Sequence, residues 1–259
     1  MTSRRGVLAL TTLFRLPHEG MQAFEVLSRG SAMLVHRTGA KRNPTHVHVL
    51  TCAHVACPWR YSSYYPHDWL EHVDENFVKH TLALREVGSG ATKWEVDLLP
   101  HTLVHPTRDL ALLELQSSIL TNDDSVDPFD LDTAFAVAEN EPLEFHGHIQ
   151  LNETAPILPE SVAGAYFWLN PTTKQAFASS EKVLAQGMCG GAAFTKQGRK
   201  VVGLIEGIVP VVENASPAYK TLENHVAVIP RDDLADFVVN FEAGRATSDL
   251  LFTGTALYD

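Results

Sequence analysis

The sequence predicts an all-β protein, and three observations lead to this prediction. Its apolar segments are short, rich in Val, Leu and Thr, and bounded by Gly, Pro, Asn or Asp, as is typical of β-strands. Strand and helix patterns do not alternate along the chain as they do in proteins built on a parallel sheet. The 259 residues, 45% of them hydrophobic, suffice for one large β domain or two smaller barrels that share an interface.

The expected strands are spread along most of the chain. They cover 23–36, 45–51, 94–100, 110–115, 165–170, 200–209 and 225–229. Many short strands of this kind indicate a β-barrel or a β-sandwich.

One segment has the period of a helix. After Pro230, the apolar residues Leu234, Phe237, Val238 and Phe241 recur at the spacing that places them on one helical face. Two aspartates lie in the first turn, where the helix dipole favours negative charge. The pattern predicts a single helix that closes the domain.

Three segments look irregular. Residues 121–132 contain five aspartates and a proline, which predicts an exposed connection and places the boundary between two β units near it. Residues 58–77 combine tyrosines, tryptophans and acids over a length unusual for a loop between strands, and we expect them to cover or bind something. Residues 244–259 are apolar without a period, and form either a last strand or an arm that packs on a partner.

The composition argues against several classes of protein. The formal charge of −11, with cations that are not clustered, would repel a nucleic-acid backbone. The longest apolar runs fall well short of the roughly 20 residues that a membrane-spanning helix needs. We therefore expect neither a nucleic-acid partner nor a membrane span.

Cysteine usage and the N-terminus bear on the compartment. An odd count of three cysteines cannot form a disulfide framework and favours a reducing, intracellular compartment. Residues 1–16 contain three arginines, several hydroxyls and no acid, the composition of a mitochondrial transit peptide. A first strand that includes 13–16, in a cytoplasmic protein, is the alternative.

Two residues of the first half of the chain have the properties of a general base and its partner. His54 follows the expected strand 45–51, where an imidazole can face a cleft. Asp109 opens the expected strand 110–115, where it can accept a hydrogen bond from the imidazole and select its tautomer. Either residue alone is more often structural.

The candidate nucleophile lies in the stretch QGMCGGAAF. Glycines on both sides of Cys189 allow a tight loop whose N–H groups converge, so the N–H groups of Gly187 and Cys189 are the candidate oxyanion hole. The alternative is a glycine-rich hairpin around a buried thiol. The order favours the catalytic interpretation: His54 precedes Asp109, and Asp109 precedes Cys189, as histidine, aspartate and nucleophile follow one another in chymotrypsin-like proteases.

On these motifs the chain resembles the trypsin-like (chymotrypsin-fold) peptidases, and most closely the HtrA/Deg type. The similar segments span about residues 24–243 and are GSAMLV at 30–35, VLTCAHV at 49–55, RDLALLEL at 108–115, GMCGGAAFTKQGRKVVGL at 187–204 and NHVAVIP at 224–230. The chain departs from the family in having Cys189 where serine is usual, and Met188 and Ala192 in the same loop.

The resemblance implies two perpendicular six-stranded antiparallel β-barrels with the active site between them. It places His54 and Asp109 in a first lobe, 1–125, and Cys189 in a second lobe, 126–243, which includes the closing helix and precedes the tail 244–259. It also implies a pocket for the substrate side chain formed by residues 182–187 and 204–208. The candidate pocket residues are Val183, Leu204, Ile205, Glu206 and Gly207.

Two functions remain open from the sequence. The first is a cysteine endopeptidase that cleaves polypeptides through a Cys-His-Asp triad and needs no cofactor. The second is a catalytically inactive protease homologue that serves as a structural subunit of a larger assembly, in which the segment 58–77 or the tail contacts protein partners.

Metal binding is a third and lesser alternative. His46 and His48 lie on one face of an expected strand, close in sequence to Cys52 and Cys57. No pair of ligands has a zinc-site spacing of the CxxC or HExxH type, so no metal site is predicted.

Overall fold

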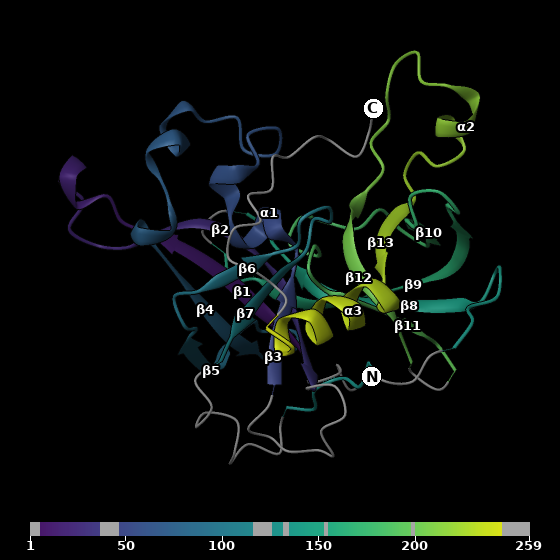
Figure 1. Cartoon of the computed structure of the whole chain (residues 1–259), viewed down its shortest axis with the longest axis horizontal. Helices are drawn as coiled ribbons and strands as arrows, with labels where there is room; N and C mark the ends of the chain where they lie inside the picture. Colours follow the sequence, from purple (N-terminus) through teal and green to yellow (C-terminus); the bar gives the residue numbers. More distant parts are fainter. Residues whose placement is uncertain are drawn as a thin grey trace.

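The computed structural model describes residues 6–36, 47–115, 126–131, 135–152, 155–197 and 200–244. Its strands form two antiparallel sheets that lie side by side, one built from the first half of the chain and one from the second (Figure 1). This architecture confirms the predicted all-β class.

The first sheet has the strand order β5-β4-β1-β2-β3-β7-β6. Its strands are β1 (Val7–Phe14), β2 (Glu25–His36), β3 (Val47–Thr51), β4 (Val78–Arg85), β5 (Thr92–Asp97), β6 (Thr102–Val104) and β7 (Ala111–Glu114). Beyond the end of β5, the N–H of Leu98 donates to the carbonyl of His80 in β4, and the N–H of Leu99 donates to the carbonyl of Glu114 in β7. The segment from β5 to β6 thus joins both edges of the sheet. The sheet has seven strands, where six were expected for the first barrel.

The second sheet is a closed six-stranded barrel with the order β10-β13-β12-β11-β8-β9. Its strands are β8 (Pro142–Ile149), β9 (Leu158–Leu169), β10 (Ala176–Ser180), β11 (Ala192–Thr195), β12 (Val201–Ile208) and β13 (Val226–Pro230). Phe145 of β8, Val202 of β12 and Val228 of β13 are among the residues that fill its interior. This closed barrel agrees with the prediction for the second lobe.

The two sheets share a hydrophobic core. Successive side chains on a strand point to opposite faces, so Leu204 of β12 packs with residues of the first sheet, whereas the next residue, Ile205, points into the second barrel. Phe194 of β11 and Ile229 of β13 join Leu204 in this shared cluster. The shared packing sets the first sheet and the nucleophile loop of the second barrel against each other.

Helical segments are few and short. They are η1 (Pro17–Glu19), α1 (Ala53–Ala56), η2 (Pro58–Arg60), η3 (Asp68–His72), η4 (Glu75–Phe77), α2 (Pro217–Lys220) and α3 (Arg231–Glu242). α3 begins directly after Pro230 and buries Leu234, Phe237 and Val238, which confirms the predicted closing helix. It lies across the junction of the two sheets (Figure 1) and is tied to the first by an ion pair of 2.6 Å between Asp233 and Arg108.

The predicted boundaries fall largely on parts of the chain outside the described residues. These parts include 121–125 and 132 of the expected connection, residues 1–5, and the tail beyond 244. Before the second barrel begins, the chain returns to β2, where the N–H of Phe129 donates to the carbonyl of Leu34. The division into lobes at 125 and 126 therefore stays a prediction. Within the described ranges, no helix has the length and apolar character needed to cross a membrane.

Candidate active site

His54 and Asp109 come from two paired strands of the first sheet. β3 ends at Thr51, and the single turn of α1 that follows holds His54, while Asp109 lies two residues before β7. Thr51 is paired with Ala111 of β7. The pairing of β3 with β7 therefore brings together two residues that are 55 positions apart in the sequence.

Both carboxylate oxygens of Asp109 hold the histidine. The imidazole Nδ1 of His54 lies 2.5 Å from Oδ2, and its backbone N–H donates to Oδ1 at 2.8 Å. Both side chains are buried. Because a carboxylate only accepts hydrogen bonds, Nδ1 carries a proton, and Nε2 remains for a second partner.

The second partner of the imidazole is the thiol of Cys189. Burial lowers the pKa of His54, but the charge and hydrogen bond of Asp109, together with a hydrogen bond to Cys189, outweigh burial and raise that pKa well above its usual 6.5. The structure thus favours the protonated form of His54, with the imidazole between the carboxylate of Asp109 and the sulfur of Cys189.

The loop that carries Cys189 is bonded to both sheets. Gly190 donates to the carbonyl of Ile205 in β12 at 2.8 Å, and Ile205 donates in return to Gly191 at 2.8 Å. From the first sheet, the N–H of Ser31 in β2 donates to the carbonyl of Cys189 at 2.9 Å. These bonds position the half-buried nucleophile at the junction of the sheets.

The directions of the Gly187 and Cys189 N–H groups follow from the hydrogen bonds of the carbonyls that precede them. The carbonyl of Gln186 accepts a bond from Gln150, and the carbonyl of Met188 accepts one from Gly191. The C=O and N–H of a planar trans peptide point in opposite directions, so both N–H groups face away from these acceptors. Among the described residues, neither N–H has a hydrogen-bond acceptor. Two such donors can stabilise an oxyanion.

The hydroxyl of Ser31 in β2 forms hydrogen bonds with two segments of the second half of the chain, the loop that carries Cys189 and strand β8. It donates to the carbonyl of Gly187 at 2.7 Å and accepts from the N–H of His148 in β8 at 2.8 Å. The sequence motif GSAMLV includes Ser31 but shows nothing of this role, because its partners are more than 100 positions away. Ser31 is a positioning residue that sequence reasoning missed.

The segment 58–77 contacts His54. The ring of Tyr64 stacks on the imidazole of His54 with 4.5 Å between centroids and 3° between planes, although Tyr64 is 48% exposed. Leu70 and Val73 anchor the segment in a small cluster with Phe14 of β1. The segment was expected to cover or bind something, and Tyr64 covers one face of the imidazole.

The residues expected to form the substrate pocket lie in different surroundings. Val183 is exposed, whereas Leu204 and Ile205 are buried in the shared core and in the second barrel respectively. A Cβ atom at Gly207 would face open space, and the adjacent Glu206 is 4% exposed. Their role in substrate binding stays a prediction.

Glu206 is a buried acid close to the catalytic pair. Burial, and secondarily the charge of Asp109, raise its pKa from 4.5 to about 7, against the opposing influence of His54 and Arg108. A group whose pKa is raised by folding binds its proton more tightly in the folded state. Its contribution to stability is therefore lost as the pH rises from about 4.5 through about 7.

Glu206→Gln is expected to remove this pH dependence. Relative to wild type, the free energy of unfolding of the variant should rise by about 3 kcal/mol between pH 4.5 and pH 8, because the amide cannot ionise. Urea unfolding across this range measures the difference, with the exposed Glu181→Gln as the control. Parallel pH profiles of wild type and Glu206→Gln would contradict the prediction.

Three buried side chains offer potential metal ligands. One ligand atom each from Cys52, His54 and Asp109 lies within 4.8 Å of the others. The thiol of Cys52, however, donates to the carbonyl of Ile205 at 3.2 Å, and burial followed by the charge of Asp109 raises its pKa well above the usual value. The group is therefore better described as part of the histidine site than as a metal centre.

The alternative metal site of the sequence is only partly described. His46 lies outside the described residues, and Nε2 of His48 lies 2.9 Å from the carboxylate of Glu242 in α3. His48 therefore has a structural partner.

No protein-family model matches the chain, and a search of curated proteins finds no match either. The fold and the site therefore carry the functional argument. A closed six-stranded antiparallel barrel beside a second antiparallel sheet, with Cys52, His54 and Asp109 close together, is compatible with the class of trypsin-like folds.

Proposed function

We propose that the protein is a cysteine endopeptidase with the triad Cys189, His54 and Asp109. The observation that carries the proposal is the imidazole of His54, hydrogen-bonded to the carboxylate of Asp109 and to the thiol of Cys189. The residues come from both halves of the chain and meet where the two sheets pack together.

The geometry supports the following reaction on a polypeptide. Before substrate is attacked, the proton of the Cys189 thiol has passed to Nε2 of His54, which gives an imidazolium and a thiolate, and the thiolate attacks the carbonyl carbon of the scissile peptide bond. The N–H groups of Gly187 and Cys189 donate to the oxyanion of the tetrahedral intermediate. The imidazolium then protonates the leaving amine as the C–N bond breaks and a thioester forms.

Hydrolysis of the thioester restores the enzyme. His54 accepts a proton from water as the water oxygen attacks the thioester carbonyl, and the Cys189 sulfur leaves and regains its proton. Asp109 holds the imidazole in one orientation through both steps and stabilises its charged form. No cofactor takes part in this proposal.

Labelling with a peptidyl chloromethyl ketone tests the proposal. Wild type should be labelled at Cys189, His54→Ala should react about 100-fold more slowly or worse, and Cys189→Ala should not be labelled there. The half-buried His225, which lies on the second barrel, supplies a matched control as His225→Ala. Mass spectrometry of tryptic peptides identifies the labelled thiol.

The same experiment contains an internal reference. Cys52 and Cys57 are buried, and burial raises the pKa of Cys57 to about 12, so both should react slowly. If Cys189 reacts no faster than these two thiols in the folded protein, the peptidase proposal fails. The inactive structural subunit is then the better account.

A further inference from the structure

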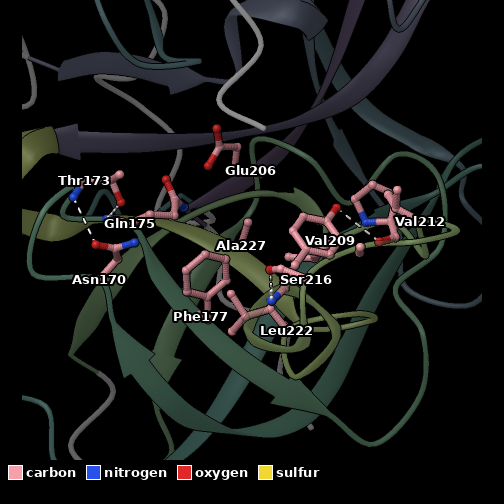
Figure 2. A pocket seen from close by; sticks show the side chains of 13 residues that line it. Asn170, Thr173, Gln175, Phe177, Glu206, Val209, Val212, Ser216, Leu222 and Ala227 are labelled. Carbon is pink, nitrogen blue, oxygen red and sulfur yellow. Dashed lines mark hydrogen bonds between the residues drawn. The ribbon is translucent and has the colours of Figure 1, made fainter. Parts of the chain in front are cut away.

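A second site lies on the outer side of the second barrel. The chain between β12 and β13, which includes α2, encloses a cavity of about 530 Å³ against β10 and β13. Its size is within the range of small-molecule sites. Figure 2 shows its polar residues Asn170, Thr173, Gln175 and Glu206 toward one side, with Phe177 and Leu222 opposite.

The polar side of this cavity has an unmet hydrogen-bond acceptor. Gln175 is 8% exposed. Its Nε2 donates to the carbonyl of Val228 at 3.0 Å, and this bond identifies which atom of the side-chain amide is the nitrogen and which is the oxygen. Its Oε1 is buried without a partner among the described residues. An unpaired buried acceptor costs free energy, and a ligand donor would remove that cost.

The second polar group is the carboxyl of Glu206. It is almost fully buried, and the neighbouring Gln175 side chain favours its charged form. A carboxylate and an amide oxygen together accept hydrogen bonds from a cationic nitrogen, which carries several donors. The chemistry of this side favours a cation over an anion.

The remainder of the cavity is largely apolar, and the hydroxyl of its Ser216 already accepts a hydrogen bond from the N–H of Tyr219. Phe177, Val209 and Ala227 form a buried cluster there, with Tyr219 and Leu222 packed against it. Such a wall accommodates an aliphatic or aromatic body but gives it no polar partner.

We propose that this cavity binds an apolar group that ends in an ammonium or amidinium cation, with the cation at Glu206 and Gln175. The ammonium donates to the Glu206 carboxylate and to the orphan Oε1 of Gln175, and the apolar body lies against Phe177. None of the residues 182–187 lines the cavity, nor do His54, Asp109 or Cys189. The cavity therefore shares Glu206 with the substrate pocket predicted from the sequence but none of its residues 182–187, and binding there does not require a reactive Cys189.

Calorimetry with three ligands of one shape tests the proposal. We expect 4-phenylbutylamine to bind, and the matched 4-phenylbutanol and 4-phenylbutanoate to bind at least 10-fold more weakly. Glu206→Gln should weaken amine binding by about 10- to 100-fold, because it replaces a charged acceptor by a neutral one of the same size. Equal affinity for amine and alcohol, or an unchanged affinity in Glu206→Gln, would overturn the proposal.

Two substitutions at the surface test where the amine binds without altering the buried carboxyl of Glu206. Val212 lines the cavity and is 43% exposed, whereas the neighbouring Val211 is 66% exposed and does not line it. Val212→Trp should narrow the cavity and weaken amine binding, and Val211→Trp should leave it unchanged. Equal effects of the two variants would show that the amine binds elsewhere.

The pH dependence supplies a third readout. Affinity for the amine should rise from pH 6 to pH 8 as Glu206 ionises around its raised pKa of about 7. The charged and titratable groups that act on Glu206 are Asp109, His54, Arg108 and Cys52. The same titration in Glu206→Gln therefore separates the change in affinity caused by ionisation of Glu206 from any change caused by these other groups. A rise of equal size in that variant would contradict the role of Glu206.

A blocked lysine derivative, N-acetyl-lysine methylamide, distinguishes two kinds of ligand that carry an ammonium group on an apolar chain: a lysine side chain of a polypeptide and a small free amine. If it competes with 4-phenylbutylamine, a lysine side chain of a polypeptide is a suitable ligand. If the free amine alone binds, the site is selective for small amines.

Discussion

Asp109→Asn is expected to lower the rate of Cys189 labelling by about 1,000- to 10,000-fold. In the folded protein, one oxygen of Asp109 accepts the backbone N–H of His54, and the other accepts Nδ1–H. In the variant, the remaining oxygen can keep the backbone bond, which leaves the NH₂ group facing Nδ1. The imidazole must then carry its proton on Nε2, where it can no longer accept the proton of the thiol.

Loss of the negative charge of Asp109 also lowers the rate of Cys189 labelling. After the opposing influence of burial, the charge of Asp109 is the main cause that raises the pKa of His54, so without it the imidazolium form is lost at lower pH. The rate of modification by a peptidyl chloromethyl ketone, measured from pH 5 to pH 9, reports both effects. Asp97→Asn, on the exposed side of β5, is the control. A rate within about 10-fold of wild type would exclude the orienting role given to Asp109.

Gly190→Ala is expected to lower the free energy of unfolding by about 2–6 kcal/mol. Gly190 has φ +84°, and a Cβ atom there would lie 2.0 Å from the carbonyl oxygen of Ser31 and 2.4 Å from Oγ1 of Thr51. The first sheet would have to move away from the nucleophile loop to make room. Labelling of Cys189 should fall together with stability.

Gly88 provides a matched control for the backbone contribution. Its φ of +87° is nearly the same, but a Cβ atom there would meet nothing within 4 Å. Gly88→Ala should therefore cost only about 1–2 kcal/mol, the strain of a left-handed backbone. Urea unfolding of both variants separates strain from contact, and equal losses would contradict the close approach of the two sheets at Gly190.

Much of the fold could be predicted because strand and helix patterns are local. The apolar spacing after Pro230 is that of α3, and the run 200–209 contains β12. β4, β6, β8, β10 and β11 lie outside the expected strands. In β8 the sequence PLEFHGHI places Leu143 and Phe145 in the barrel interior, but a glycine and two histidines interrupt its apolar pattern.

The candidate site likewise has one part that could be predicted from the sequence and another part that could not. Residue type, glycine spacing and order along the chain were enough to select His54, Asp109 and Cys189 as candidates. The contacts of Ser31 and the stacking of Tyr64 could not be selected, because their partners are fixed by the packing of the two sheets and of the segment 58–77.

By itself, the sequence determined the β character and the closing helix, and it supplied the candidates for chemistry. These depend on periodicity and residue type, which act over a few neighbouring positions. The tertiary structure alone decided that the imidazole lies between Asp109 and Cys189, and that Glu206 is a buried acid beside an unpaired amide oxygen. The physical reason is that pKa values and hydrogen-bond partners depend on burial and on charges that long-range strand pairing brings within a few ångströms of each other.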